Sequence, residues 1–362
     1  MNGWRGRTAV VVTALSLAVG VAACDRTDGS GSDDGGFAIG LLLPANGTSR
    51  FGYFDKPLIE KKVKELCGDC AVEYANAGGD AAIQRQQMGS MMTKGIKVVI
   101  LGAVDPMALR SSVEDMKEAG IPVVAYDRLA EGPISGYVTF DGAQVGRVQA
   151  EALLKGMGDK ADGGRIVMMN GAVTDPNARW FKGGALSVLE DKVKIAQTYD
   201  TEGWREENAH TNMSGAIAAL GVDGIDGVYA ANDRIASGVI AALKAADVTP
   251  LPPVTGQDAD LAAVQRILTG DQYMTVYKPF KPEADAAAAM AVALGRGEDI
   301  GGLARTTVDS ATAKDIPAVL LTPVSVTVGN IKDTLVKDGM YTLDEICSPE
   351  YRTACDKAGL TE

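Results

Sequence analysis

Histidine is almost absent from this sequence, since His210 is the only one among 362 residues. This scarcity excludes His-rich metal sites, and it leaves any Ser-His-Asp catalysis to depend on one residue. A single histidine on a helix is far more often a surface residue than a catalytic one. The sequence therefore indicates neither a metal centre nor an enzyme, and it indicates no cofactor.

Net positive charge is also lacking, because the formal net charge is -12 and the isoelectric point is about 4.7. A protein that binds nucleic acid needs a basic surface, so nucleic acid is excluded as a partner. No glycine fingerprint for dinucleotides and no phosphate-binding loop occurs at any predicted strand-to-helix turn. Nucleotide cofactors are therefore not indicated either.

Long hydrophobic runs are missing apart from one near the amino terminus. An apolar stretch over residues 9–23 follows Arg5 and Arg7 and ends at Cys24. It is short for a transmembrane helix, and its charged start and small residues before the break are typical of a secretory signal. We predict that residues 1–23 are a signal peptide.

The break itself, Val21-Ala22-Ala23-Cys24, resembles the lipobox of bacterial lipoproteins, in which the cysteine is diacylated and becomes the new amino terminus. Residues 25–36 contain nothing apolar to bury, so we predict a flexible tether over 24–36. The protein is then expected to be lipid-anchored at the outer face of the cytoplasmic membrane and to work in water. An ordinary signal peptide with a chance cysteine is the alternative.

Four cysteines remain after Cys24, and in an oxidising compartment they allow three disulfide connectivities. We expect the local pairing, Cys67–Cys70 and Cys347–Cys355, which closes two short loops. A Cys-x-x-Cys can instead be a redox motif or half of a zinc site. The redox form usually starts a helix after a strand, whereas Cys67 follows a helical pattern.

Short apolar runs alternate with helical patterns from residue 37 onward. The run Val123–Tyr126, opened by Pro122, is typical of a parallel strand buried on both faces. Two such α/β series follow one another, and the chain is too long for one core, so we predict two lobes with parallel sheets. The predicted strands span 37–43, 71–74, 98–101, 123–126, 137–141, 165–170, 193–199, 228–231, 253–255, 274–277 and 318–321.

Polar groups close the same kind of strand several times, and carboxyl ends of parallel strands are where open α/β sheets place ligand groups. Carboxylate, amide and guanidinium groups match vicinal hydroxyls, and aromatic faces cover the apolar side of a sugar ring. Singly, each group could be a surface ion pair, a helix cap or a turn. Together they predict a site for a neutral, hydroxyl-rich molecule. The polar candidates are Asp127, Arg128, Asn232, Asp258 and Lys278, and the aromatic ones are Phe51, beside Arg50, and Trp204.

These segments resemble the bacterial periplasmic sugar-binding proteins of the ribose/galactose type, and within them the members that bind D-xylose for an ABC transporter. The resemblance covers residues 37 to about 340. It is carried by VAYDR (124–128), TFD (139–141), DPN (175–177), GW (203–204), AND (231–233), GQDADL (256–261), MTVYKP (274–279) and LLTP (320–323). The GQDADL and MTVYKP runs are together quite specific.

The resemblance implies the fold called periplasmic binding protein type I. In it, two doubly wound parallel-sheet lobes are joined by three crossing strands, and a ligand cleft lies between them. It places residues 37–140 and 278–321 in the first lobe, and 141–277 and 322–362 in the second. The carboxyl end beyond Met340 has no counterpart in the family pattern.

The resemblance also implies roles for individual residues. Those expected to hydrogen-bond the sugar are Arg50, Asp127, Arg128, Asn177, Asn232, Asp258 and Lys278, with Asp175 in support and Trp204 stacking on the ring. The family has Trp after the arginine of the first loop, where this chain has Phe51. Tyr53 and Phe54 follow, and which of these three aromatics stacks is left open.

The function implied is capture of a monosaccharide, D-xylose first, and its delivery to the permease subunits of an ABC transporter by closure of the cleft, with the protein acting as a monomer. Alternatives are a sugar sensor for a signalling receptor, or a binding protein for ribose, arabinose or glucose. A glycoside-processing enzyme using Asp127 and Asp258 is disfavoured, because cations beside carboxylates keep them ionised and unsuited to be general acids.

The lipid anchor can be tested directly. Because no apolar residue of the tether can hold the protein at a membrane, Cys24→Ala should release it into the medium, as followed by cell fractionation. A mutant that stays membrane-bound, or a mature amino terminus at another residue, would contradict the lipobox interpretation.

Overall fold

The computed structural model describes residues 35–44 and 50–361. The predicted signal peptide, the predicted lipidation site at Cys24 and all of the tether but its last two residues therefore lie outside the described residues. None of the helices in the described ranges has the length and apolarity that a membrane span requires.

The first group of elements surrounds a seven-stranded sheet with the order β10-β11-β5-β4-β3-β1-β2. All neighbouring strands are parallel except β10 and β11. Every residue of the central strand β4 is buried, as predicted for the Val123–Tyr126 run. The strands are β1 (Ala38–Leu43), β2 (Ala71–Asn76), β3 (Val98–Leu101), β4 (Val123–Tyr126), β5 (Gly136–Phe140), β10 (Thr306–Val308) and β11 (Ile316–Leu321).

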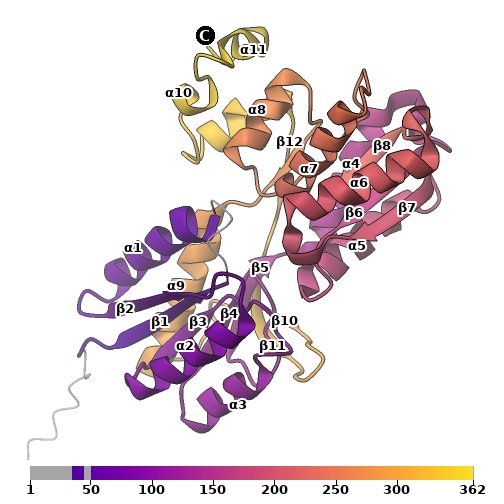
Figure 1. Cartoon of the computed structure of the whole chain (residues 1–362). Coiled ribbons are helices and arrows are strands. Elements are labelled where there is room, and N and C mark those ends of the chain that lie inside the picture. The colour runs from indigo at the N-terminus through magenta and orange to yellow at the C-terminus, as the bar shows by residue number, and fades with distance from the viewer. Residues whose placement is uncertain (1–34, 45–49, 362) are drawn as a thin grey trace, which may run out of the picture. The chain divides into compact units, whose positions relative to one another are not determined.

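Helices cover both faces of this sheet (Figure 1). On one face, α1 (Lys56–Leu66) and α9 (Phe280–Arg296) pack on a core that includes Leu41 and Val124. On the other, α2 (Ala81–Thr93) and α3 (Arg110–Glu118) pack on a core with Leu101 and Ala125. Successive strand residues point to opposite faces, so a strand that is covered twice must be apolar throughout.

The second group contains the parallel strands β7 (Lys194–Asp200), β6 (Arg165–Asn170) and β8 (Gly227–Ala230), in that order. Isolated bridges at Val254 and Gln257 continue the pairing toward β9 (Thr275–Tyr277), which pairs antiparallel with β12 (Val324–Val326). The predicted strand 253–255 is thus reduced to one bridging residue. Pro252 and Pro253 lack the N–H groups that a longer ladder needs.

Four helices of this group enclose a core built around Met168, Tyr229 and Ile235. They are α4 (Gly142–Met157), α5 (Pro176–Leu189), α6 (Glu206–Leu220) and α7 (Asp233–Ala245). Helix α8 (Leu261–Thr269) packs in a separate apolar cluster. The short 3₁₀ helices are η2 (Gly158–Ala161), η3 (Glu202–Trp204), η4 (Val222–Gly224) and η5 (Val328–Asn330).

The chain passes between the two sheet systems after β5, after β9 and after β11. We call the elements around the seven-stranded sheet the first lobe, and those around β6–β9 and β12 the second lobe. The lobe boundaries drawn from the sequence stay a prediction.

Two segments form π-helices. They are η1 (Phe51–Asp55), which runs directly into α1, and η6 (Lys332–Val336). The π-helix has i→i+5 hydrogen bonds and is often found at functional sites. Within η1, both Phe51 and Asp55 are buried.

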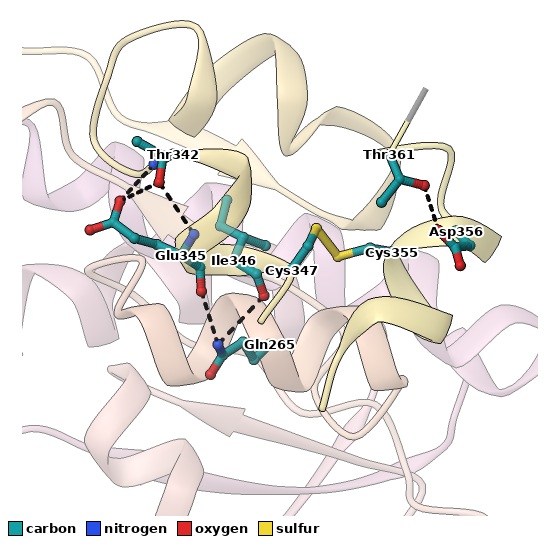
Figure 2. The surroundings of a disulfide bond; sticks show 8 residues. All are labelled: Gln265, Thr342, Glu345, Ile346, Cys347, Cys355, Asp356 and Thr361. Atoms are coloured by element: carbon teal, nitrogen blue, oxygen red, sulfur yellow. Dashed lines mark hydrogen bonds between the residues drawn. A yellow bond between two sulfur atoms is a disulfide. The ribbon is translucent and has the colours of Figure 1, made fainter. Parts of the chain in front are cut away.

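The segment beyond Met340 packs on α8. Its helices are α10 (Leu343–Ile346) and α11 (Arg352–Lys357), and Figure 2 shows the Cys347–Cys355 disulfide that joins them. The side chain of Gln265 on α8 donates to the carbonyl groups of Glu345 and Ile346. With α8 this segment forms an apolar cluster separate from the core around Met168.

Both disulfides that we predicted are present, Cys67–Cys70 at the end of α1 and Cys347–Cys355. The two pairs lie in different apolar clusters, so they do not come together as a four-cysteine zinc site. The redox-motif interpretation of Cys67 and Cys70 stays an alternative prediction, because an oxidised Cys-x-x-Cys motif is also a disulfide. Both sulfurs of the second pair are buried, which joins α10 and α11 through the core.

Replacing both Cys347 and Cys355 by Ala should lower the free energy of unfolding by about 2–3 kcal/mol, because the denatured chain regains the freedom of the closed loop. Urea unfolding would measure the loss. The matched Cys67→Ala/Cys70→Ala variant opens a shorter loop, with a sequence separation of 3 against 8, and should lose less. An unchanged midpoint for the first variant would contradict this expectation.

Candidate functional site

Asp127 follows β4 directly and has an unusual backbone, with φ at 62°. A non-glycine residue in this left-handed region is strained. Hydrogen bonds hold it there, because its carbonyl oxygen accepts from Tyr137 (3.0 Å), Thr139 (2.8 Å) and Asn177 (3.0 Å). The strain turns the carboxylate toward Arg50, whose Nη1 lies 2.8 Å from Asp127 Oδ1.

The pKa of Asp127 reflects a competition between burial and neighbouring cations. Burial favours the neutral acid, but Arg50, Lys278 and Arg128 together outweigh it and bring the pKa below its usual value. Asp127 is therefore a carboxylate at neutral pH, able to accept two hydrogen bonds from hydroxyl groups.

Arg128 reaches across to the second lobe. Its Nε lies 2.7 Å from Oδ2 of Asp175, which caps the amino terminus of α5 by accepting from Asn177 N. Burial raises the pKa of Asp175, although Arg128 opposes it. The side-chain Nδ2 of Asn177 donates to the carbonyl oxygen of Asp127. Together with the Arg128–Asp175 pair, this contact joins the two lobes. Within the described residues the Asn177 Oδ1 atom is buried without a partner.

Asn232, Asp258 and Lys278 come from the ends of the β8, Val254 and β9 segments. Asn232 Oδ1 caps α7 by accepting from Ile235 N (2.9 Å), and the residue also lines the cavity described below. Asp258 has φ at 95°, and its Oδ1 lies 2.8 Å from Lys278 Nζ. The two alternatives considered for Asn232, cap and site residue, are thus compatible.

The aromatic side chains differ in their placement. Trp204, also at positive φ, packs against the Gly171 backbone and edge-on to Phe181, with ring centroids 6.4 Å apart. Phe51 is buried beneath the guanidinium of Arg50. Tyr53 is 70% exposed, and Phe54 packs on Phe280 and Tyr341 instead. Of the three loop aromatics, only Phe51 lines the cavity described next.

One cavity of about 90 Å³ collects all the sequence-predicted site residues, from both lobes. A buried water needs roughly 10–15 Å³ by a comparable measure, so a molecule of several heavy atoms fits. His210 on α6 does not line it. The predicted lining residues are Arg50, Phe51, Asp127, Arg128, Asp175, Asn177, Trp204, Asn232, Asp258 and Lys278.

Sequence reasoning missed four further lining residues, Phe181, Gly203, Arg234 and Asp260. Phe181 lies four residues after Asn177 on α5, hence on the same helix face, and this spacing could have identified it. Asp55 and Glu283, which lie behind the cavity and contact Arg50, were also missed. No local pattern distinguishes them from surface acids.

Comparison with known proteins shows the family to which this chain belongs. The periplasmic binding protein domain model matches residues 39–299. The D-xylose-binding periplasmic protein of Escherichia coli is 37% identical over 81% of this chain and 87% of its own. The multiple sugar-binding periplasmic receptor ChvE of Rhizobium radiobacter is 30% identical over 85% and 92%.

Among solved structures, an ABC transporter solute-binding protein from Clostridium phytofermentans with bound β-D-glucose matches with a TM-score of 0.77. It is 29% identical in sequence, and the match covers 85% of this chain and 99% of that chain. The chain belongs to the periplasmic binding protein family, and it has the type I fold predicted from its sequence. The family is one of solute-binding proteins.

Gly171→Ala should displace Trp204, because an added Cβ would stand 2.0 Å from its ring. We expect a shift of tryptophan emission to longer wavelength and a loss of about 1–3 kcal/mol of stability, as for other overpacked sites. In the control Gly183→Ala the added Cβ meets nothing within 4 Å, so emission should not change. Identical spectra for both variants would show that the ring is not held by Gly171.

Proposed function

We propose that this protein is an extracytoplasmic, lipid-anchored binding protein that captures a monosaccharide, D-xylose first, and delivers it to an ABC permease. The observation that carries the proposal is one cavity in which paired carboxylates, cations, amides and three aromatic rings converge. Such groups match a ring whose edges carry hydroxyls and whose faces are apolar.

The ion pairs of Asp127 and Asp258, the two carboxyl groups considered for catalysis, support binding over catalysis. A glycosidase needs one carboxyl group with a raised pKa to protonate the leaving group. Of the two carboxylates considered for this role, Asp127 is held ionised by its cations, and Asp258 is ion-paired with Lys278. Both are then suited to accept hydrogen bonds from sugar hydroxyls.

The choice of D-xylose rests on the family resemblance and on the relatives bearing that name in Escherichia coli and Haemophilus influenzae. The small cavity supports a pentose, because a hexopyranose brings an additional hydroxymethyl group at C5. A second candidate, a sugar sensor for a signalling receptor, uses the same closing lobes. Adjacent genes for a permease and an ATPase would favour transport.

Calorimetry on the soluble form that begins after Cys24 tests this function. We expect D-xylose to bind more tightly than D-glucose, and a hundredfold ligand excess over Kd to stabilise the fold by about 2.7 kcal/mol. Asp127→Ala and Asp258→Ala should each weaken binding by about 2–4 kcal/mol, since each removes a charge-assisted bond and leaves a cation less well paired.

Asp344→Ala, at an exposed position on α10, is the control and should bind like the wild type. Equal affinity for pentoses and hexoses would refute the assignment of xylose but not of sugar binding. Failure to bind any monosaccharide, with hydrolysis of a glycoside instead, would refute the proposed function.

A further inference from the structure

A buried charge cluster lies directly behind the cavity. The Arg50 guanidinium contacts three carboxyl groups, with Nε bonding Asp55 (3.0 Å), Nη1 bonding Asp127 (2.8 Å) and Nη2 bonding Glu283. Asp55 belongs to η1 and Glu283 to α9, and both are fully buried. Of the three acids only Asp127 lines the cavity.

The contacts of the carboxyl oxygens distinguish Asp55 from Glu283. Both oxygens of Asp55 accept hydrogen bonds, one from Arg50 and the other from the Tyr126 hydroxyl at 2.6 Å. In Glu283 only Oε2 accepts, and Oε1 is buried with no partner among the described residues. A bare anionic oxygen that is buried costs far more free energy than an unpaired neutral one.

Charge balance indicates that this cluster holds at least one proton, because three ionised acids around one guanidinium would leave an excess of negative charge in the interior. Burial raises the pKa of both Asp55 and Glu283, and that of Glu283 lies well above its usual value. Because both oxygens of Asp55 accept hydrogen bonds, the unpaired Oε1 assigns the proton to Glu283. The phenols of Tyr126 and Tyr137, which also face the cluster, stay neutral because burial raises their pKa values.

We propose that Asp55 and Glu283 are positioning residues for the ligand, and that Glu283 does this as the neutral, protonated acid. The guanidinium has five N–H donors, and the three contacts fix its plane while leaving two donors for a ligand in the cavity that Arg50 lines. The positioning of Arg50 for a ligand rests on the proposed sugar-binding function, whereas the protonation of Glu283 does not depend on that function.

Two substitutions at Glu283 distinguish a neutral acceptor for Arg50 from a required negative charge. Glu283→Gln keeps the shape and the acceptor for Arg50 Nη2, so it should bind D-xylose within about threefold of the wild type. Glu283→Ala leaves that N–H without a partner and should bind about tenfold or more weakly. Asp285→Asn makes the same acid-to-amide change on α9 at a half-exposed position, where it removes only the surface ion pair with Lys281. Because such pairs contribute little, it should change neither property tested.

The pH dependence of stability gives a readout that needs no ligand. A buried acid with a raised pKa makes the folded protein less stable as the pH rises. The loss begins near the pKa of the unfolded state, 4.5, and continues through the higher pKa of the folded state. Glu283→Gln cannot ionise, so its midpoint of thermal unfolding should rise relative to the wild type as pH increases from 4 to 9. Asp285→Asn should run parallel to the wild type.

The outcomes are separable when calorimetry with D-xylose and D-glucose is combined with unfolding across pH. If Glu283→Gln binds as weakly as Glu283→Ala and its stability runs parallel to the wild type, Glu283 acts as a carboxylate and the proposal is wrong. If Glu283→Ala binds normally, the positioning role is wrong. If the wild type binds neither sugar, the proposed function fails, while the unfolding curves still decide whether Glu283 carries a proton.

Discussion

The site is governed by the need to pair charges that are removed from water. Arg50, Asp127, Asp175 and Lys278 are all buried at the ends of strands or the starts of helices. An isolated buried charge is prohibitively costly, and breaking a buried pair costs several kcal/mol. Each of these groups therefore has an opposite partner within 3 Å. The pairing fixes the side chains before any ligand arrives, which lowers the entropy lost on binding.

Backbone strain is concentrated at the same place. Among the described non-glycine residues with positive φ, Asp127, Trp204 and Asp258 all line the cavity. Such conformations cost on the order of 1–3 kcal/mol each and persist only where surrounding contacts outweigh them. At Asp127 the contacts are three hydrogen bonds to its own carbonyl group. The strained backbone directs the carboxylate of Asp127 and the indole of Trp204 into the cavity. A relaxed backbone at these positions would turn both side chains away.

Polar contacts join the two lobes beside the cavity. Arg128 pairs with Asp175, and Asn177 bonds the carbonyl of Asp127, so residues of the first lobe hold residues of the second. The ring of Phe54, in η1, also meets Tyr341 at a centroid distance of 6.0 Å. A ligand touching both sides adds to these contacts only in the closed state, and it therefore shifts the population toward closure.

Much of this could be predicted from the sequence, because strand ends are local features. The apolar run Val123–Tyr126 and the polar residues after it indicate a parallel sheet and a site at its edge, and the predicted site residues do meet in one cavity. Local patterns report periodicity and propensity, but not which distant segment covers a side chain. Glu283 meets Arg50 across 233 residues, because α9 returns to the first sheet after most of the second lobe has been built. Only that long-range packing decided which acids would be buried beside a cation, where the carboxyl-terminal helices would dock, and which aromatic ring would line the cavity.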